Sequence, residues 1–81
     1  MSTTYQIQWF GLLAERRGVV EETLDFEGRT PESVYHHFLE SHALGLKTQH
    51  LRAAVNDEFV AWDHVLQDGD SIAFLPPMSG G

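Results

Sequence analysis

The sequence predicts an α+β domain, in which a mixed five-stranded sheet carries one main helix on one face and ends in an extended C-terminal tail. Three observations predict it: alternating apolar and polar residues near the start, a helix with an apolar stripe in the middle, and a short apolar strand before two prolines at the end. The chain has 81 residues, so we expect a single domain over residues 1–75 and a tail over residues 76–81.

The first half of the chain predicts two strands separated by a short helix. Tyr5 to Phe10 alternates apolar and polar residues, which is typical of a half-buried strand. Leu12 to Arg17 is a run of helix formers that a glycine follows. Val19 to Phe26 is predicted as the second strand, but Glu22 fits poorly on its apolar face, so Thr23 is an alternative first residue. The short connection between the two strands favours an antiparallel pair.

The clearest helix start in the chain is Thr30-Pro31-Glu32. Threonine can cap a helix, proline suits the first helical position, and an acidic residue suits the positive first turn. Val34 and Phe38 then recur at helical spacing, so we expect a helix to about Ala43.

Three short strands are predicted in the second half: Leu51–Val55, Phe59–Trp62 and Ser71–Leu75. Turn residues separate them, most clearly Asp68-Gly69-Asp70. Strands before and after one main helix indicate the β-grasp, or ubiquitin-like, arrangement. In that arrangement the last strand lies in the middle of the sheet.

The predicted tail starts at Pro76-Pro77, which stops the last strand because proline has no N–H for a sheet ladder. Met78, Ser79, Gly80 and Gly81 follow. Glycines lack a Cβ and can enter a channel that is too narrow for a side chain. The reactive group at the tip is the α-carboxylate of Gly81, which needs activation, for example by AMP, before a nucleophile can attack it.

Composition excludes several classes of function. The net charge of −7 argues against nucleic-acid binding, which needs a basic surface, and favours partners with basic surfaces. There is no cysteine, no long apolar run and no signal-peptide pattern, so we expect a cytoplasmic protein that does not bind membranes. Phosphate-binding loops and nucleophile turns are also missing from the sequence, so any ATP would be used by a partner and no cofactor would be bound by this chain.

Three stretches resemble one family. They are Phe10-Gly11-Leu12-Leu13-Ala14-Glu15, then Ala54-Val55-Asn56-Asp57-Glu58-Phe59-Val60, and the segment from Leu66 to Gly81 with its Asp-Gly-Asp turn, Pro-Pro and Gly-Gly. In these stretches the chain resembles the MoaD family of ubiquitin-like sulfur carriers, which provides the small subunit of molybdopterin synthase. Met78 stands where the family often has valine, a change between two apolar side chains.

The resemblance implies a function and two partners. An E1-like (MoeB-like) enzyme would adenylate the Gly81 carboxylate with ATP, and sulfur delivery would give a thiocarboxylate. The tail would then enter the MoaE-like large subunit of molybdopterin synthase and donate sulfur to cyclic pyranopterin monophosphate. In this interpretation the chain has no catalytic site of its own but is the sulfur-donating subunit of a transferase.

A partner surface is expected around the tail, because one face of a small sheet stays open when a single helix covers the other. We predict that Phe10, Phe74, Leu75 and Pro76 contribute to it, whereas Phe59 and Trp62 could belong to the core or to an interface. Arg16, Arg17 and Arg52 are predicted to be solvated. No metal site is expected, because the five histidines do not have ligand spacing.

Three alternatives remain. The chain could carry sulfur for another pathway, such as thiamine thiazole synthesis, although the segment 12–17 and the Pro-Pro pair favour molybdopterin synthase. It could also be a ubiquitin-like protein modifier that is conjugated to lysines through Gly81. These two alternatives share the chemistry up to the adenylate. The third is a plain interaction domain whose tail has no function.

Overall fold

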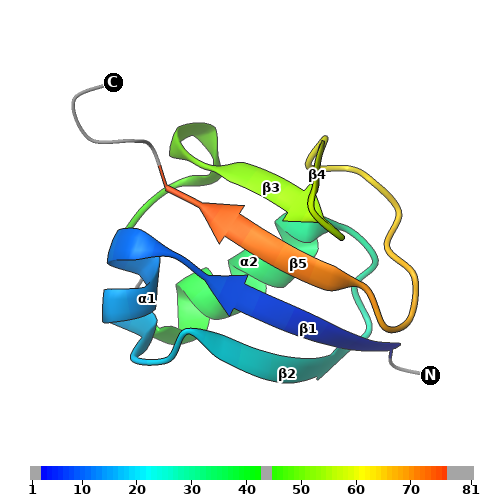
Figure 1. Cartoon of the computed structure of the whole chain (residues 1–81), viewed down its shortest axis with the longest axis horizontal. Coiled ribbons are helices and arrows are strands. Elements are labelled where there is room, and N and C mark those ends of the chain that lie inside the picture. Colours follow the sequence, from blue (N-terminus) through cyan, green and yellow to red (C-terminus); the bar gives the residue numbers. More distant parts are fainter. Residues whose placement is uncertain (1–2, 43–44, 77–81) are drawn as a thin grey trace.

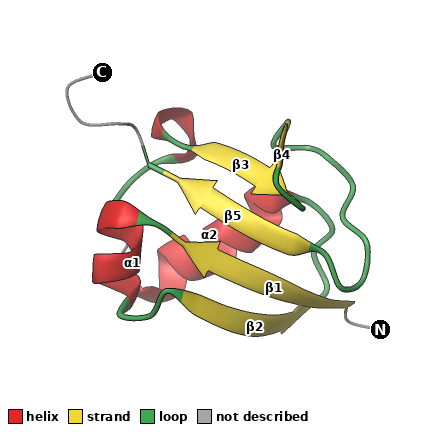
Figure 2. Cartoon of the chain, in the orientation of Figure 1, coloured by secondary structure: helices red, strands yellow, loops and turns green. Residues whose placement is uncertain are grey.

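The computed structural model of the chain describes residues 3–42 and 45–76. Along these residues the elements follow the predicted order (Figures 1 and 2). They are β1 (Thr3–Trp9), α1 (Gly11–Arg17), β2 (Glu21–Phe26), α2 (Pro31–His42), the 3-10 turn η1 (Thr48–His50), β3 (Arg52–Val55), β4 (Glu58–Val60) and β5 (Ser71–Leu75).

The five strands form one mixed sheet in the order β2-β1-β5-β3-β4. β1 and β5 run parallel, and the other neighbouring strands are antiparallel. Figure 1 shows α2 crossing behind the sheet, so the chain has two layers. The β-grasp prediction is therefore confirmed, including the central position of the last strand, β5.

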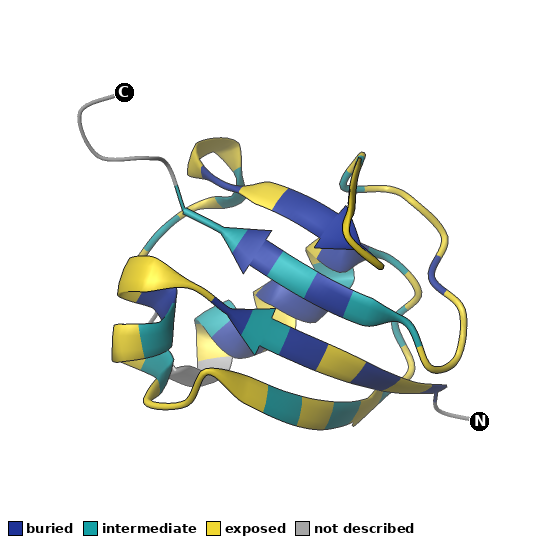
Figure 3. Ribbon diagram, in the orientation of Figure 1, coloured by how far each residue is buried: buried dark blue, intermediate teal, exposed yellow. Residues whose placement is uncertain are grey.

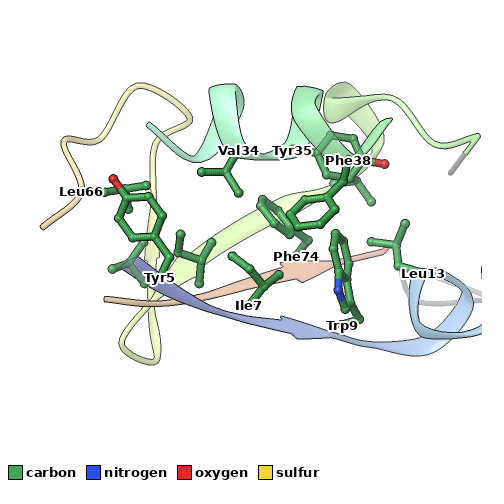
Figure 4. Packing of buried hydrophobic residues seen from close by; sticks show 12 residues of the cluster. Tyr5, Ile7, Trp9, Leu13, Val34, Tyr35, Phe38, Leu66 and Phe74 are labelled. Atoms are coloured by element: carbon green, nitrogen blue, oxygen red, sulfur yellow. The ribbon is translucent and has the colours of Figure 1, made fainter. Parts of the chain in front are cut away.

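The core lies between α2 and the facing side of the sheet (Figure 4). Val34, Tyr35 and Phe38 of α2 point toward the alternate residues of β1 and β5, which are fully or almost fully buried. Trp9 packs edge-on to Phe38, with ring centroids 5.0 Å apart and an interplanar angle of 88°. Aromatic contacts of this kind add to the stability that apolar burial already provides.

Local signals in the sequence explain how both helices are delimited. At the start of α2, the Ser33 N–H donates to Thr30 Oγ1 and the Thr30 N–H donates to Ser33 Oγ, both at 3.2 Å, so the two residues cap each other. At the end of α1, Gly18 has a φ of 86° and its N–H donates to the Ala14 carbonyl. A left-handed residue at this position suits glycine because it has no Cβ.

The turn before β5 fixes where the central strand begins. Gly69 has a φ of 86°, and the Asp70 N–H donates to the Gln67 carbonyl across the turn. Asp68 Oδ1 accepts from the Thr4 N–H at 2.8 Å, which connects the turn to β1. The predicted Asp-Gly-Asp turn is confirmed, and its hydrogen bonds anchor β5 beside β1.

Some predicted boundaries are wrong by a few residues. The first strand is Thr3–Trp9 and leaves out Phe10, β2 begins at Glu21 instead of Val19 or Thr23, and β4 is Glu58–Val60 and ends before Trp62. The connector before β3 contains η1, which was not predicted. Strand ends depend on the pairing with neighbouring strands, and local sequence does not reveal that pairing.

Candidate functional site

The second face of the sheet, opposite α2, is divided into a polar half and an apolar half. On the polar half, Thr4 Oγ1 donates to Asp25 Oδ1 at 2.7 Å and Gln6 Nε2 donates to Thr23 Oγ1 at 3.1 Å, across β1 and β2. These cross-strand pairs leave that half hydrophilic. The apolar half of this face therefore begins where β1 meets β5.

On the apolar half, the strand register places small and apolar residues in one row. Ala73 of β5 lies opposite Ala54 of β3, and Ala54 lies opposite Phe59 of β4. Phe59 is 64% exposed and Phe10, directly after β1, is 44% exposed. We call this surface the open-face patch; it consists of Phe10, Ala54, Phe59, Ala73, Leu75 and Pro76.

Two hollows shape the open-face patch. The larger hollow, of about 710 Å³, is lined by Gln49, His50, Leu51, Arg52, Phe59, Leu75 and Pro76. The smaller one, of about 190 Å³, is lined by Gln8, Phe10, Ala54, Asp57, Phe59, Ala73 and Leu75. Phe59 and Leu75 separate the two hollows and belong to both. An apolar, hollowed surface of this kind is typical of a protein interface.

The last two described residues, Leu75 and Pro76, belong to this patch. Leu75 is the last residue of β5, and Pro76 lines the larger hollow. The turn after β1 packs against it closely, because a Cβ placed on Gly11 would lie only 3.3 Å from Pro76 Cγ. The predicted tail residues Pro77, Met78, Ser79, Gly80 and Gly81 lie outside the described residues.

The four residues predicted to surround the tail are not all at the surface. Phe10 is exposed, and Leu75 and Pro76 are half-buried beside the hollows. Phe74 is fully buried, and its ring lies 5.3 Å from Trp9 and 5.2 Å from Tyr35. The prediction that Phe74 contributes to the surface is therefore wrong. Successive residues of a strand point to opposite faces, so Leu75 and Phe74 cannot both lie on the open face.

The prediction that Arg17 is solvated is also wrong. Its guanidinium donates to Glu22 Oε1 at 2.6 Å, and the other carboxylate oxygen of Glu22 accepts from Trp9 Nε1, also at 2.6 Å. Arg17 Cζ lies 5.7 Å from the centroid of the Phe38 ring. This network explains why a glutamate is accommodated on the inward face of β2, since both of its oxygens have charged or polar donors.

Sequence reasoning missed two residues of the open-face patch, Ala54 and Ala73, which are small and give no signal individually. Arg52, which is predicted to be solvated, lines the larger hollow. Strand alternation relates Ala73 to Leu75, but only the cross-strand register shows that Ala54 and Phe59 lie beside them. Arg52 is exposed, and its Cζ lies 5.5 Å from the centroid of the Phe59 ring.

Other types of site have no support in the described part of the chain. His36 and His37 are both exposed, and no group of three or more His, Cys, Asp or Glu side chains in residues 3–42 and 45–76 could hold a metal ion. In the same residues, no helix is long and apolar enough to cross a membrane. The side chain of His42 lies outside the described part of the chain.

Comparison with known proteins identifies close relatives. The chain is 31% identical to a molybdopterin synthase sulfur carrier subunit from Haemophilus influenzae, over 93% of this chain and 96% of that protein. It is 54% identical to the molybdopterin synthase sulfur carrier subunit of Escherichia coli over 39 residues, which cover 48% of each chain.

Solved structures share the fold. SAMP1 from Haloferax volcanii aligns with a TM-score of 0.79 and 25% identity, over 96% of this chain and 99% of that one. A second match is one chain of a complex of subunits 1 and 2 of the molybdopterin-converting factor from Helicobacter pylori. It aligns with a TM-score of 0.66 and 24% identity, over 98% of this chain and all of that one. The family model described as ThiS family matches residues 7–81, and the chain belongs to this family of ubiquitin-like proteins.

Proposed function

We propose that this protein is the sulfur carrier subunit of a molybdopterin synthase, and that Gly81 carries the sulfur as a terminal thiocarboxylate. The observation that carries the proposal is the position of the tail. It follows β5, the central strand, in the chain, and its first residue, Pro76, lines the larger hollow of the open-face patch. A partner that binds the patch would therefore also receive the tail.

The architecture suits a carrier that is passed between enzymes. β5 is hydrogen-bonded to β1 on one side and to β3 on the other, so the root of the tail belongs to the most constrained part of the sheet. A rigid root reduces the number of positions that the tip can occupy, which lowers the entropic cost of placing it in a channel. Glycines at positions 80 and 81 keep that tip narrow.

The proposed chemistry takes place on one carboxylate. An oxygen of the Gly81 carboxylate attacks the α-phosphorus of ATP, pyrophosphate leaves, and an acyl adenylate forms. A persulfide of another protein attacks the acyl carbon and AMP leaves, which gives an acyl disulfide. A second thiol of that protein then attacks the donor's own sulfur atom, so that a disulfide forms on the donor and the thiocarboxylate leaves. The adenylating partner would supply the nucleotide site, and the large subunit would supply the site where sulfur passes to cyclic pyranopterin monophosphate.

The terminal group can be tested directly by mass spectrometry. The chain is co-expressed with its cognate adenylating enzyme and sulfur source, and the C-terminal peptide is analysed. We expect a mass gain equal to the difference between a sulfur and an oxygen atom, confined to that peptide. One alanine appended after Gly81 should abolish the gain and the synthesis of molybdopterin, because the reactive carbon is displaced from the active site.

A matched control separates a tail effect from a general one. One alanine inserted after Met1 adds the same residue at the other end of the chain and should leave sulfur loading unchanged. Full molybdopterin synthesis by the variant extended after Gly81, in cells that lack another carrier, would refute the proposal.

The same experiment separates the alternatives. A carrier for thiamine thiazole synthesis would also gain the sulfur mass, but it would support thiazole formation and not molybdopterin formation. A protein modifier would form higher-mass conjugates that survive thiol reagents and disappear when Gly81 is deleted.

A further inference from the structure

The larger hollow of the open-face patch carries the positive charge of Arg52. None of its described lining residues is acidic. The whole chain carries a net charge of −7, so a hollow with an arginine and no carboxylate contrasts with the rest of the molecule. The smaller hollow, by comparison, includes Asp57.

Arg52 is held in this hollow by the fold. It is the first residue of β3, it lies opposite Leu75 in the register, and its guanidinium stacks on Phe59, 5.5 Å from the ring centroid. Stacking on an aromatic ring favours a limited set of side-chain positions and leaves the N–H donors at the edge of the guanidinium available. Among the described residues, no carboxylate forms an ion pair with Arg52.

We propose that Arg52, stacked on Phe59 at the root of the tail, is a specificity-determining residue that pairs with an Asp or Glu of the large subunit when that subunit covers the open-face patch. This inference rests on the proposed function, because it assumes that the large subunit is the partner that receives the tail. It adds a chemical requirement for that partner: an apolar surface with one carboxylate near the entrance of its tail channel.

The physical reason is the cost of covering a charge. A partner that buries the patch around Phe59 and Leu75 must also remove water from the guanidinium between them. Removing water from an unpaired charge is strongly unfavourable, and a carboxylate with good geometry compensates for it. Arginine suits this role because its planar donors bind both oxygens of a carboxylate.

Affinity measurements at several salt concentrations test the proposal. The probe is the purified large subunit of molybdopterin synthase from the same organism, titrated with the full chain. We expect Arg52→Glu to raise the dissociation constant by about tenfold or more, because it places a glutamate next to the carboxylate of the large subunit. Arg52→Lys keeps the charge and should weaken binding less. Arg52→Met keeps an apolar stem and should reduce the dependence of binding on salt.

Arg29 provides the matched control. It is an exposed arginine in the connection between β2 and α2, outside both hollows. Arg29→Glu makes the same change in charge as Arg52→Glu, but outside the hollows. At a salt concentration that screens long-range charge effects, it should leave the affinity within about twofold of that of the unchanged chain. An equal loss for both variants would mean that only net charge matters, and would overturn the proposal.

A cross-link can identify the partner carboxylate. Lys47 is the only lysine of the chain, so Lys47→Arg removes the internal amine. Adding Arg52→Lys to this variant then places one amine in the hollow, and a carbodiimide can couple it directly to a carboxylate in contact. We expect a cross-linked peptide that contains an Asp or Glu of the large subunit. The same background with Arg29→Lys should give no such peptide.

Failure of this inference can be told apart from failure of the proposed function. If the large subunit binds the unchanged chain, loses affinity for Phe10→Ala, and is insensitive to Arg52→Glu, then the patch is the interface and Arg52 has no role. If the large subunit does not bind the unchanged chain at all, the proposed function falls and this inference falls with it.

Discussion

At the scale of single residues, Tyr35 shows how burial changes the pKa of a titratable group in the core. Its hydroxyl donates to the Leu46 carbonyl, and its ring packs against Phe74 and Trp62. Burial raises the pKa of Tyr35 above its ordinary value of 10.0, because the phenolate would lose its water; Arg16 acts in the opposite direction and lowers it. The neutral form is therefore the one that the fold accommodates.

This shift predicts how stability changes in alkali. Below the ordinary pKa of 10.0, Tyr35 is protonated in both the folded and the unfolded chain, so its contribution does not change with pH. Above that value the unfolded chain releases the proton first, and the free energy of unfolding should fall as the pH rises through the raised pKa. Urea unfolding of the unchanged chain and of Tyr35→Phe, between neutral pH and alkaline pH, measures this effect.

The Tyr35→Phe variant should lose about 1 kcal/mol at neutral pH, because the hydrogen bond to the Leu46 carbonyl is missing. Its unfolding free energy should then decline less steeply in alkali than that of the unchanged chain. Parallel declines for the two proteins would show that Tyr35 is not responsible for the alkaline loss.

Glu22 is a second residue whose role depends on its surroundings. In the sequence it interrupts the apolar face of β2. In the structure its carboxylate joins Trp9 of β1 to Arg17 of α1, which ties three elements together at one end of the sheet. A partly buried ion pair is not in itself strong evidence for stability, but its geometry specifies how α1 packs against β1 and β2.

At the scale of elements, the hairpin between β3 and β4 has an unusual backbone. Val55 pairs with Glu58, so the loop consists of Asn56 and Asp57, whose φ values are 52° and 71°. Positive φ at both loop residues matches the twist of the two strands, and glycine is the residue that favours it most at the second position. Asn56 also holds the turn to β5, because its Oδ1 accepts from the Ser71 N–H.

The hairpin offers a stabilising substitution. Asp57→Gly should raise the free energy of unfolding by about 0.5 kcal/mol, since the removal of strain at a φ of 71° exceeds the entropic cost of glycine. Asp57→Ala should lower it by about 1 kcal/mol, because alanine lacks the short polar side chain that allows aspartate to adopt a positive φ. Thermal unfolding of the two variants measures the difference, and equal stabilities would show that the backbone of this turn is unstrained.

At the scale of the whole molecule, the two faces of the sheet have different tasks. One face packs on α2 and supplies the core, whereas the other face carries no helix. Along β5, the buried residues of the core face alternate with half-buried residues of the other face (Figure 3). The central strand serves both, because Ile72 and Phe74 face the helix while Ala73 and Leu75 face outward. The tail therefore begins where the central strand meets the open-face patch.

This division predicts opposite effects for two phenylalanines. Phe74→Ala should destabilise the fold by about 3–5 kcal/mol, because it leaves a cavity among Trp9, Tyr35 and Trp62. Phe10→Ala should change stability by less than about 1 kcal/mol and weaken binding of the large subunit by about tenfold or more, as expected for an aromatic anchor. Thermal unfolding and titration calorimetry on both variants give the comparison.

A milder substitution covers the case in which Phe74→Ala does not fold. Phe74→Leu keeps much of the apolar volume, so it should remain folded with a lower melting temperature and bind the partner nearly normally. Weak binding by a fully folded Phe74→Leu variant would place Phe74 in the interface after all. Unchanged binding by Phe10→Ala would remove Phe10 from it.

The sequence by itself determined the order of the elements, the capping of α2 at Thr30 and the turn at Gly69. These features depend on local signals: periodicity, cap residues and glycine at a positive φ. Membership of the family also depends on sequence, because the three matching stretches are continuous in the chain.

Tertiary structure alone decided which face of the last strand is covered, and so excluded Phe74 from the surface and retained Leu75. Alternation divides a strand into two sets of residues, but the packing of a helix from elsewhere in the chain selects the buried set. Pairing across strands also brought Ala54, Phe59 and Arg52 to the root of the tail, and placed Arg17 and Trp9 on the two oxygens of Glu22. Contacts between residues distant in sequence depend on register, and no local pattern in this chain encodes that register.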